Sequence, residues 1–246
     1  EAARTRYMRE NFDYDALTHE GQVAWRFAEF IAANNAQQGE FWDHGYIFTQ
    51  FFGPHTQLPT ILIGYHRVDT VEHAEAYISR LNGLGDVIET YTAQADARAQ
   101  DGVLAPAFAY PIVVTAARRF ITGAPFDDSG EDSPLMADFR GKVEALDIDQ
   151  AEKGRLIAEA EAALTSVVEP AYQRIIALFE EQAEVATDDD GVWKHPDGGE
   201  FYNYLLNNYT TMDLSAEEIH QLGLSEVERI HGEMRGIMAQ VGYEGT

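Results

Sequence analysis

The sequence predicts an all-α protein, a multi-helix array with little or no sheet. Apolar residues recur at spacings of three and four over most of the 246 residues, which keeps them on one face of a helix. Alternating strand-like runs are nearly missing, since Ile112-Val113-Val114 is the one β-branched cluster and its neighbours favour a helix. A hydrophobic content of 45% supports a sizeable core. We therefore expect eight or more helices within a single domain.

Helices in the first half are expected over residues 18–37, 58–66, 71–98 and 107–121. The clearest is 71–98, where Thr70 occupies the N-cap position and apolar residues recur at helical spacing. These apolar residues are Ala76, Ile78, Leu81, Leu84, Ile88 and Tyr91. A turn-rich acidic loop follows this half and ends at Pro134, a residue favoured at the first helical position.

Helices in the second half are expected over residues 134–146, 157–178 and 197–209, and near the C-terminus. Within the long 157–178 helix, Pro170 predicts a kink or a restart, because proline lacks a backbone N–H and its ring clashes with the preceding turn. Ser215 and Glu218 have the capping-box form that opens the last helix. Its apolar face is formed by Val227, Ile230, Met234, Ile237 and Val241, before Gly242 in a left-handed C-cap position.

Composition and charge limit the partners. There are 42 Asp and Glu against 17 Lys and Arg, a formal charge of −25, so phosphate backbones and anionic lipid headgroups are repelled and we expect no nucleic-acid partner. The absence of cysteine excludes thiol catalysis, disulfides and Cys-ligated zinc. The most apolar stretch, residues 103–117, is too short and too broken by prolines to insert into a membrane. No secretory leader is visible at the first residues, although the missing initial Met leaves its earlier removal open.

Two patterns could bind a metal. His19-Glu20 starts like a zinc-binding HExxH helix, but Val23 stands where the second histidine belongs. The ExxH unit of di-iron bundles occurs at Glu217/His220 and again eleven residues later. Eleven residues of helix span roughly 16 Å, so one dinuclear site cannot use both copies. We expect no metal ligand and no catalytic residue in this chain, and a metal site at Glu217 with His220 is the alternative.

Other residues with chemical potential are expected to have structural roles. His44, His55 and His66 lack a paired nucleophile and are interpreted as packing residues. The acidic stretch Asp127, Asp128, Glu131 and Asp132 lacks the ligand spacing of a calcium loop and is interpreted as solvated. Tyr202, Tyr204 and Tyr209 are typical of a core edge with exposed hydroxyls. Residue chemistry alone therefore gives this chain no reaction.

The last 50 residues resemble a known family. Gly199 and Tyr202 lead through Leu206 to Thr210-Thr211 and Asp213-Leu214, and then to a Glu-Glu-Ile-His-x-x-Gly-Leu helix that starts at Glu217. Glu233-Met234 and Gly242-Tyr243 complete the pattern, and upstream AEAYISRLNGL and ITGAPFDDSGEDSPL are similar as well. These features resemble domain-of-unknown-function family 885, over about residues 58–245.

This resemblance implies a zincin-like metallopeptidase relative that is often exported, as a periplasmic or outer-surface lipoprotein. The metal motif of that family, His-Glu-x-x-Pro-Gly-His, lies C-terminal to the matched stretch and is absent from this sequence. The chain is therefore interpreted as the non-catalytic helical portion of a zinc-dependent peptidase-like protein, truncated at both ends and inactive alone. Zinc would belong to the parent protein and not to this chain. A naturally short member without the motif stays open.

Two expectations follow for surfaces. In the parent protein, the segment that carries Tyr202, Tyr204, Thr210 and Thr211 is our candidate for the wall of a substrate cleft. The missing C-terminal half is the expected partner, and its absence would leave apolar surface that favours a homo-oligomer as salt screens the charge. The alternative is a helical binding or structural module with no reaction.

Overall fold

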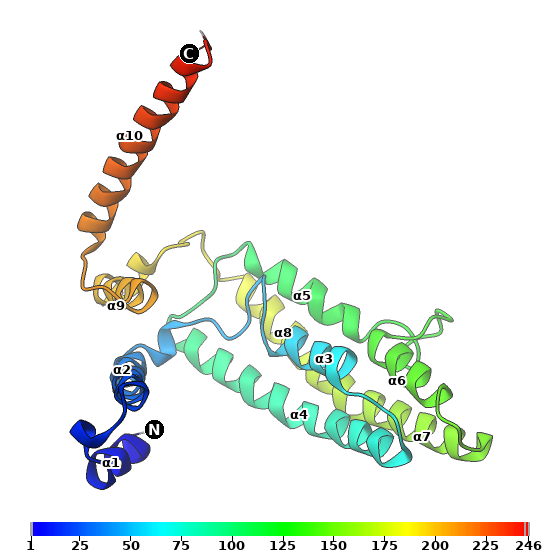
Figure 1. The fold of residues 1–246 in the computed structure, drawn as a ribbon. Helices are drawn as coiled ribbons and strands as arrows, with labels where there is room; N and C mark the ends of the chain where they lie inside the picture. Colours follow the sequence, from blue (N-terminus) through cyan, green and yellow to red (C-terminus); the bar gives the residue numbers. More distant parts are fainter. Residues whose placement is uncertain (1, 244, 246) are drawn as a thin grey trace. The chain divides into compact units, whose positions relative to one another are not determined.

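The structure, a computed structural model, describes residues 2–243 and 245, and over these residues the fold is all-α (Figure 1). A single bridge between Ala124 and Asp132 is the only β pairing among them. The helices are α1 (Ala2–Asn11), α2 (His19–Glu40), α3 (Pro54–Tyr65), α4 (Val71–Gln100), α5 (Ala109–Phe120), α6 (Pro134–Glu144), α7 (Gln150–Ala163), α8 (Glu169–Ala183), α9 (Gly198–Thr210) and α10 (Ala216–Gln240). The predicted fold class is confirmed.

Local capping signals set where several helices begin. Thr70 Oγ1 accepts a hydrogen bond from the backbone N–H of His73 at the start of α4. Ser215 and Glu218 form both bonds of the expected capping box at the start of α10. Asp149 caps α7, which begins seven residues before the position where the apolar spacing indicates a helix. The short helix α1 is a further addition to the predicted set.

The chain divides into two compact units, and each is described by itself. Unit 2 contains residues 43–190 and therefore α3 to α8, whereas unit 1 contains residues 1–42 and 191–246. No helix within the described residues has the length and apolarity needed to cross a bilayer.

Unit 2 is built around α4 and the long α7–α8 rod, which lie side by side and run in the same direction (Figure 1). Glu75 and Glu89 of α4 are ion-paired with Arg155 of α7 and Arg174 of α8, respectively. The helix α5 packs on α8, and α3 contacts α4, α5 and α6. This arrangement encloses one continuous core.

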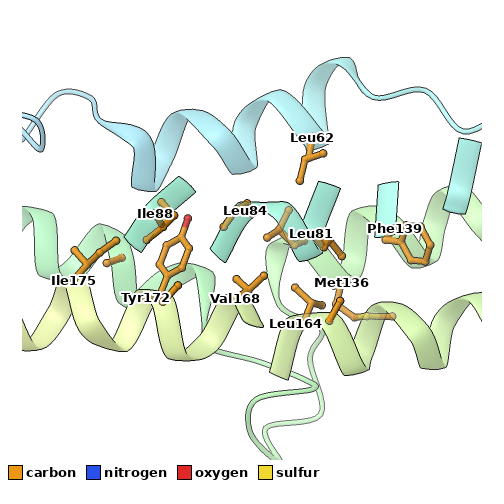
Figure 2. Close-up of a cluster of buried hydrophobic side chains, with 14 of the residues drawn as sticks. Leu62, Leu81, Leu84, Ile88, Met136, Phe139, Leu164, Val168, Tyr172 and Ile175 are labelled. Carbon is orange, nitrogen blue, oxygen red and sulfur yellow. The ribbon is translucent and has the colours of Figure 1, made fainter. Parts of the chain in front are cut away.

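The core of unit 2 consists mainly of side chains from α3 to α8, with Phe48 and Ala105 from the connecting segments, and Figure 2 shows part of it. Tyr77, Tyr110 and Tyr172 are among its largest fully buried residues. The hydroxyl of Tyr172 donates a 2.6 Å hydrogen bond to the backbone carbonyl of His55, which satisfies its polar end and joins α8 to the first turn of α3.

A π-helical turn over residues 164–168 joins α7 to α8. Pro170 follows this turn, in the first turn of α8. The kink or restart that Pro170 predicts is therefore a π-helical turn just before the proline. The turn faces α4 at Gly85, where an added Cβ would lie 2.4 Å from Cγ1 of Val167. Only a residue without a side chain allows the two helices to approach this closely.

We expect Gly85→Ala to lower the free energy of unfolding by about 1 kcal/mol. The clash costs about 2 kcal/mol, because Val167 is β-branched and stiff, and alanine returns about 1 kcal/mol of helix propensity. Gly83→Ala is the control, because its Cβ would meet nothing within 4 Å, and it should raise stability by about 1 kcal/mol. Urea unfolding of both variants measures the difference, and equal effects would contradict a close approach at Gly85.

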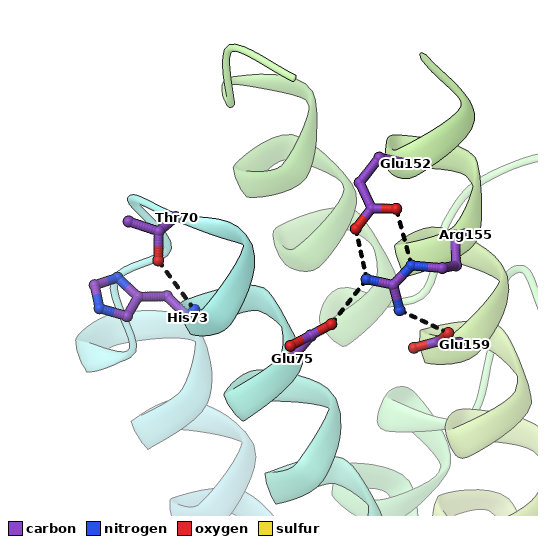
Figure 3. A network of polar contacts seen from close by, with 6 residues as sticks. All are labelled: Thr70, His73, Glu75, Glu152, Arg155 and Glu159. Carbon is purple, nitrogen blue, oxygen red and sulfur yellow. Dashed lines mark hydrogen bonds and ion pairs between the residues drawn. The ribbon is translucent and has the colours of Figure 1, made fainter. Parts of the chain in front are cut away.

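Arg155 connects α7 to α4 through a network of carboxylates (Figure 3). Its guanidinium donates to Glu152 and Glu159 on its own helix and to Glu75 of α4. These hydrogen bonds raise the pKa of Arg155 and lower that of Glu152. The network is exposed, so it fixes the register of the two helices more than it stabilises them.

Unit 1 has little core of its own. The helix α1 contacts α2, where Arg9 is ion-paired with Glu29 at 2.9 Å. The C-cap of α2, Phe41, stacks on Tyr204 of α9, and Asn34 of α2 donates to Asn208 of α9. None of the side chains described for α10 is buried.

Candidate functional surface

The aromatic residues of α9 divide between its inner and outer faces. The Phe41 ring lies 5.3 Å from the Tyr204 ring and 5.5 Å from the Phe201 ring, centroid to centroid. Burial raises the pKa of the Tyr204 hydroxyl. Tyr202 is two positions away along the helix and is exposed, because a spacing of two turns a helical side chain by roughly 200°. The two tyrosines named as cleft candidates therefore do not share one surface.

The two threonines of the candidate lie in an exposed turn between α9 and α10. Thr211 has a left-handed backbone with φ 56° and ψ 21°, which is unusual for a β-branched residue and costs on the order of 1–2 kcal/mol. The Thr210 hydroxyl donates to the carbonyl of Leu206 at 2.7 Å and accepts from the N–H of Met212 at 3.2 Å. Tyr202, Thr210 and Thr211 are thus exposed to solvent, with Tyr204 buried behind them.

The possible metal ligands Glu217 and His220 lie on α10, with their side chains exposed. Glu217 accepts a hydrogen bond from Gln221 at 2.8 Å. Within the described residues, no three His, Asp or Glu side chains gather closely enough to hold an ion. The geometry offers Glu217 and His220 no third ligand from that part of the chain.

We expect the isolated chain to retain less than one zinc or iron ion per molecule, because two ligands on one exposed helix turn bind a cation weakly. Metal analysis after incubation with zinc and gel filtration measures this. Glu217→Gln and His220→Gln should not change the result. One tightly held ion that either substitution removes would show that a metal site exists at the start of α10.

A polar cluster of unit 2 joins α3, α4 and α6, and its residues were not among the predicted sites. Lys142 donates to the backbone carbonyls of Leu62 and Ile63 at 3.1 Å and to Asp138 at 2.7 Å. The hydroxyl of Tyr77 also donates to Asp138, at 2.9 Å. Lys142 therefore caps the C-terminal end of α3, where a cation is favoured. The i, i+4 spacing of Asp138 and Lys142 is the one signal of this cluster that the sequence contains.

His66 extends this cluster toward α4. Its Nε2 lies 3.0 Å from the carbonyl of His73 and must carry the hydrogen, so Nδ1 accepts from Arg80. Burial lowers the pKa of His66, and the charges of Arg80 and Lys142 lower it further. The polar groups of this cluster hydrogen-bond to one another and to the backbone across three helices, which favours a structural role.

Open grooves also occur on each unit. One of about 760 Å³ lies between α1 and α2, and Arg9 on its wall is already paired with Glu29. Another, of about 460 Å³, lies between α3 and α5 and is bordered by Thr60, Ile63 and Phe120. Neither groove brings together groups that could perform a reaction.

The fold is that of an all-α protein, and within the described residues no three His, Asp or Glu side chains gather closely enough to hold a metal ion. The family described as bacterial proteins of unknown function, DUF885, matches residues 1–246, and the chain belongs to this family. No curated protein matches the sequence significantly.

A solved structure shares the fold and is 29% identical. It is a protein of Colwellia psychrerythraea described as a candidate lipoprotein, with a TM-score of 0.71. The match covers 82% of this chain but 34% of the Colwellia chain. This chain therefore spans about a third of the length of its structural neighbour.

Proposed function

We propose that residues 1–246 form the helical, non-catalytic portion of an exported, zinc-dependent peptidase-like protein. The observation that carries this proposal is the length of the match, since 34% of the Colwellia chain corresponds to this sequence. The zinc motif that the family resemblance implies is absent from these residues, so the catalytic part would lie in the remainder. Export is proposed because the neighbour is described as a candidate lipoprotein.

In this proposal, the exposed face of α9 and the turn between α9 and α10 contribute to the wall of the substrate cleft. Tyr202, Thr210 and Thr211 are exposed. The hydroxyls of Thr210 and Thr211 donate to backbone carbonyls nearby, and their oxygens retain a lone pair that can accept a hydrogen bond from a peptide backbone. Tyr204 is buried and would position α9 without contacting a substrate.

The first experiment is to read the open reading frame on both sides of the codons for residues 1–246. We expect it to continue into a His-Glu-x-x-Pro-Gly-His helix. The protein from the complete frame should bind one zinc ion and hydrolyse peptides, whereas residues 1–246 should do neither. A frame that ends at residue 246 would instead support a binding or structural module.

The role of α9 and of the α9–α10 turn is tested by substitution in the protein from the complete frame. Tyr202→Ala and Thr211→Ala should raise KM for a peptide substrate several-fold with a smaller change in kcat, because they remove ground-state contacts. Tyr65→Ala, at an exposed tyrosine of unit 2, is the control. Unchanged KM in the first two variants would contradict a place for this turn in the cleft.

A further inference from the structure

The two units bury very different amounts of apolar surface. Among the described residues, every buried apolar side chain except Tyr204 lies in unit 2. Unit 1 has instead two thirds of the large apolar side chains that are exposed. A group of helices without a core does not offset its own loss of conformational entropy, so unit 1 requires a further surface to pack against.

The uncovered apolar surface is concentrated on α10. Its apolar stripe consists of Ile219, Val227, Ile230, Met234, Ile237 and Val241, which fall within roughly 80° of arc at 100° per residue. The exposed fraction of these side chains reaches 59% at Ile237 and 74% at Val241. The opposite side carries polar residues such as Gln221 and Glu228. From Val227 to Val241 the stripe is narrow and unbroken, which is typical of a helix that packs along one face.

Length and charge indicate what covers the stripe. About two thirds of the Colwellia chain lies outside the matched stretch, so a protein of that length has ample additional polypeptide. A second copy of this chain would bring another 25 negative charges and would lose translational freedom on association. A covalently attached segment avoids that loss.

We propose that the apolar stripe of α10 is the docking surface for the polypeptide that family members carry outside the stretch matched here. The proposal rests on the proposed function only in treating this chain as part of a longer protein. It requires neither zinc nor peptidase activity. The helix α10 is then an interface between the helical portion and the remainder.

Hydrogen exchange of the α10 amides is the first test, in residues 1–246 and in the protein from the complete reading frame. We expect rapid exchange in the short chain and exchange at least about 100-fold slower in the longer protein, since packing suppresses local opening. Slow exchange in the monomeric short chain would overturn the proposal, because the cover would then lie within residues 1–246. Equally fast exchange in both would overturn it too.

The second test replaces the stripe with residues of similar helix propensity. Ile230→Ser with Ile237→Ser should lower the Tm of the longer protein by about 5 °C or more and leave that of residues 1–246 unchanged. The control, Gln221→Ser with Glu228→Ser, changes the opposite side of α10 and should have little effect. If the stripe variant does not fold in the longer protein while the control does, the proposal is supported. Equal Tm values for variant and control would overturn it.

Sedimentation across a salt series tests the alternative that a second copy of this chain covers the stripe. We expect residues 1–246 to self-associate weakly, more at high salt, and the longer protein to remain monomeric. A tight dimer of residues 1–246 at low salt that the stripe variant dissociates would overturn the proposal in favour of self-pairing. A longer protein with a protected α10 and no peptide hydrolysis would disprove the proposed function and leave this docking surface in place.

Discussion

Gly123→Ala is expected to lower the free energy of unfolding by about 3 kcal/mol. Gly123 has φ +96°, which costs an alanine about 1–2 kcal/mol. An added Cβ would also lie 2.7 Å from the backbone N of Ser133 and 2.8 Å from the carbonyl O of Glu131. These are backbone atoms that cannot rotate away, so overpacking adds a further 1–3 kcal/mol.

The contacts around Gly123 close the loop between α5 and α6. The N–H of Ala124 donates to the carbonyl of Glu131 at 2.7 Å, and the N–H of Ser133 donates to that of Ala124 at 2.9 Å. The N–H of Gly123 itself donates to Asp127. A side chain at position 123 would separate the two ends of this loop and also weaken the ion pair between Asp132 and Arg140 of α6.

Gly130→Ala in the same loop is the matched control for Gly123→Ala. Gly130 has φ +85°, but an added Cβ would meet nothing within 4 Å, so only the backbone strain of about 1–2 kcal/mol remains. Urea unfolding at constant pH measures both variants. If they lose the same stability, the close approach at Gly123 is not what holds the loop.

The spacing of apolar residues predicted most helices but not what packs against their apolar faces. Residues 71–98 and 227–241 have the same spacing of apolar residues, yet most of the apolar face of the first stretch is buried in unit 2 and that of the second is exposed on α10. Ala76 and Tyr91, which the spacing placed on the apolar face of 71–98, are exposed. Spacing shows that a helix has an apolar face, whereas the partner of that face is a property of the whole chain. The start of α7 was missed because Asp149 defines it by capping, before the apolar spacing becomes regular.

The candidate surface was predictable only in part. The capping box of α10 and the motif that resembles the family could be recognised in the sequence, because each lies within a short stretch of the chain. The cluster at Lys142 was not, because its partners come from three helices that are distant in sequence. The different positions of Tyr202 and Tyr204 could have been predicted from their spacing, because residues two apart do not share one face of a helix.

Acidification is expected to destabilise unit 2 through His55. This side chain is 1% exposed, its ring packs edge-on against Phe48, and its Nδ1 has no hydrogen-bond partner among the described residues. Burial lowers its pKa to about 4 from an ordinary 6.5. The unfolded chain therefore binds a proton in a pH range where the folded chain does not. Stability from His55 is complete above pH 6.5 and declines as the pH falls toward 4.

The loss attributable to His55 is about 2 kcal/mol between pH 7.5 and pH 5, where the unfolded histidine is almost fully protonated and the folded one is not. His66 acts in the same direction, because its pKa is lowered as well. Urea unfolding of wild type and His55→Leu at the two pH values isolates His55, since carboxylates and net charge contribute equally to both. We expect the leucine variant to lose about 2 kcal/mol less than wild type on acidification, whatever its stability at pH 7.5. His231→Gln, on exposed α10, should follow wild type, and parallel curves for wild type and His55→Leu would show that burial does not keep His55 neutral.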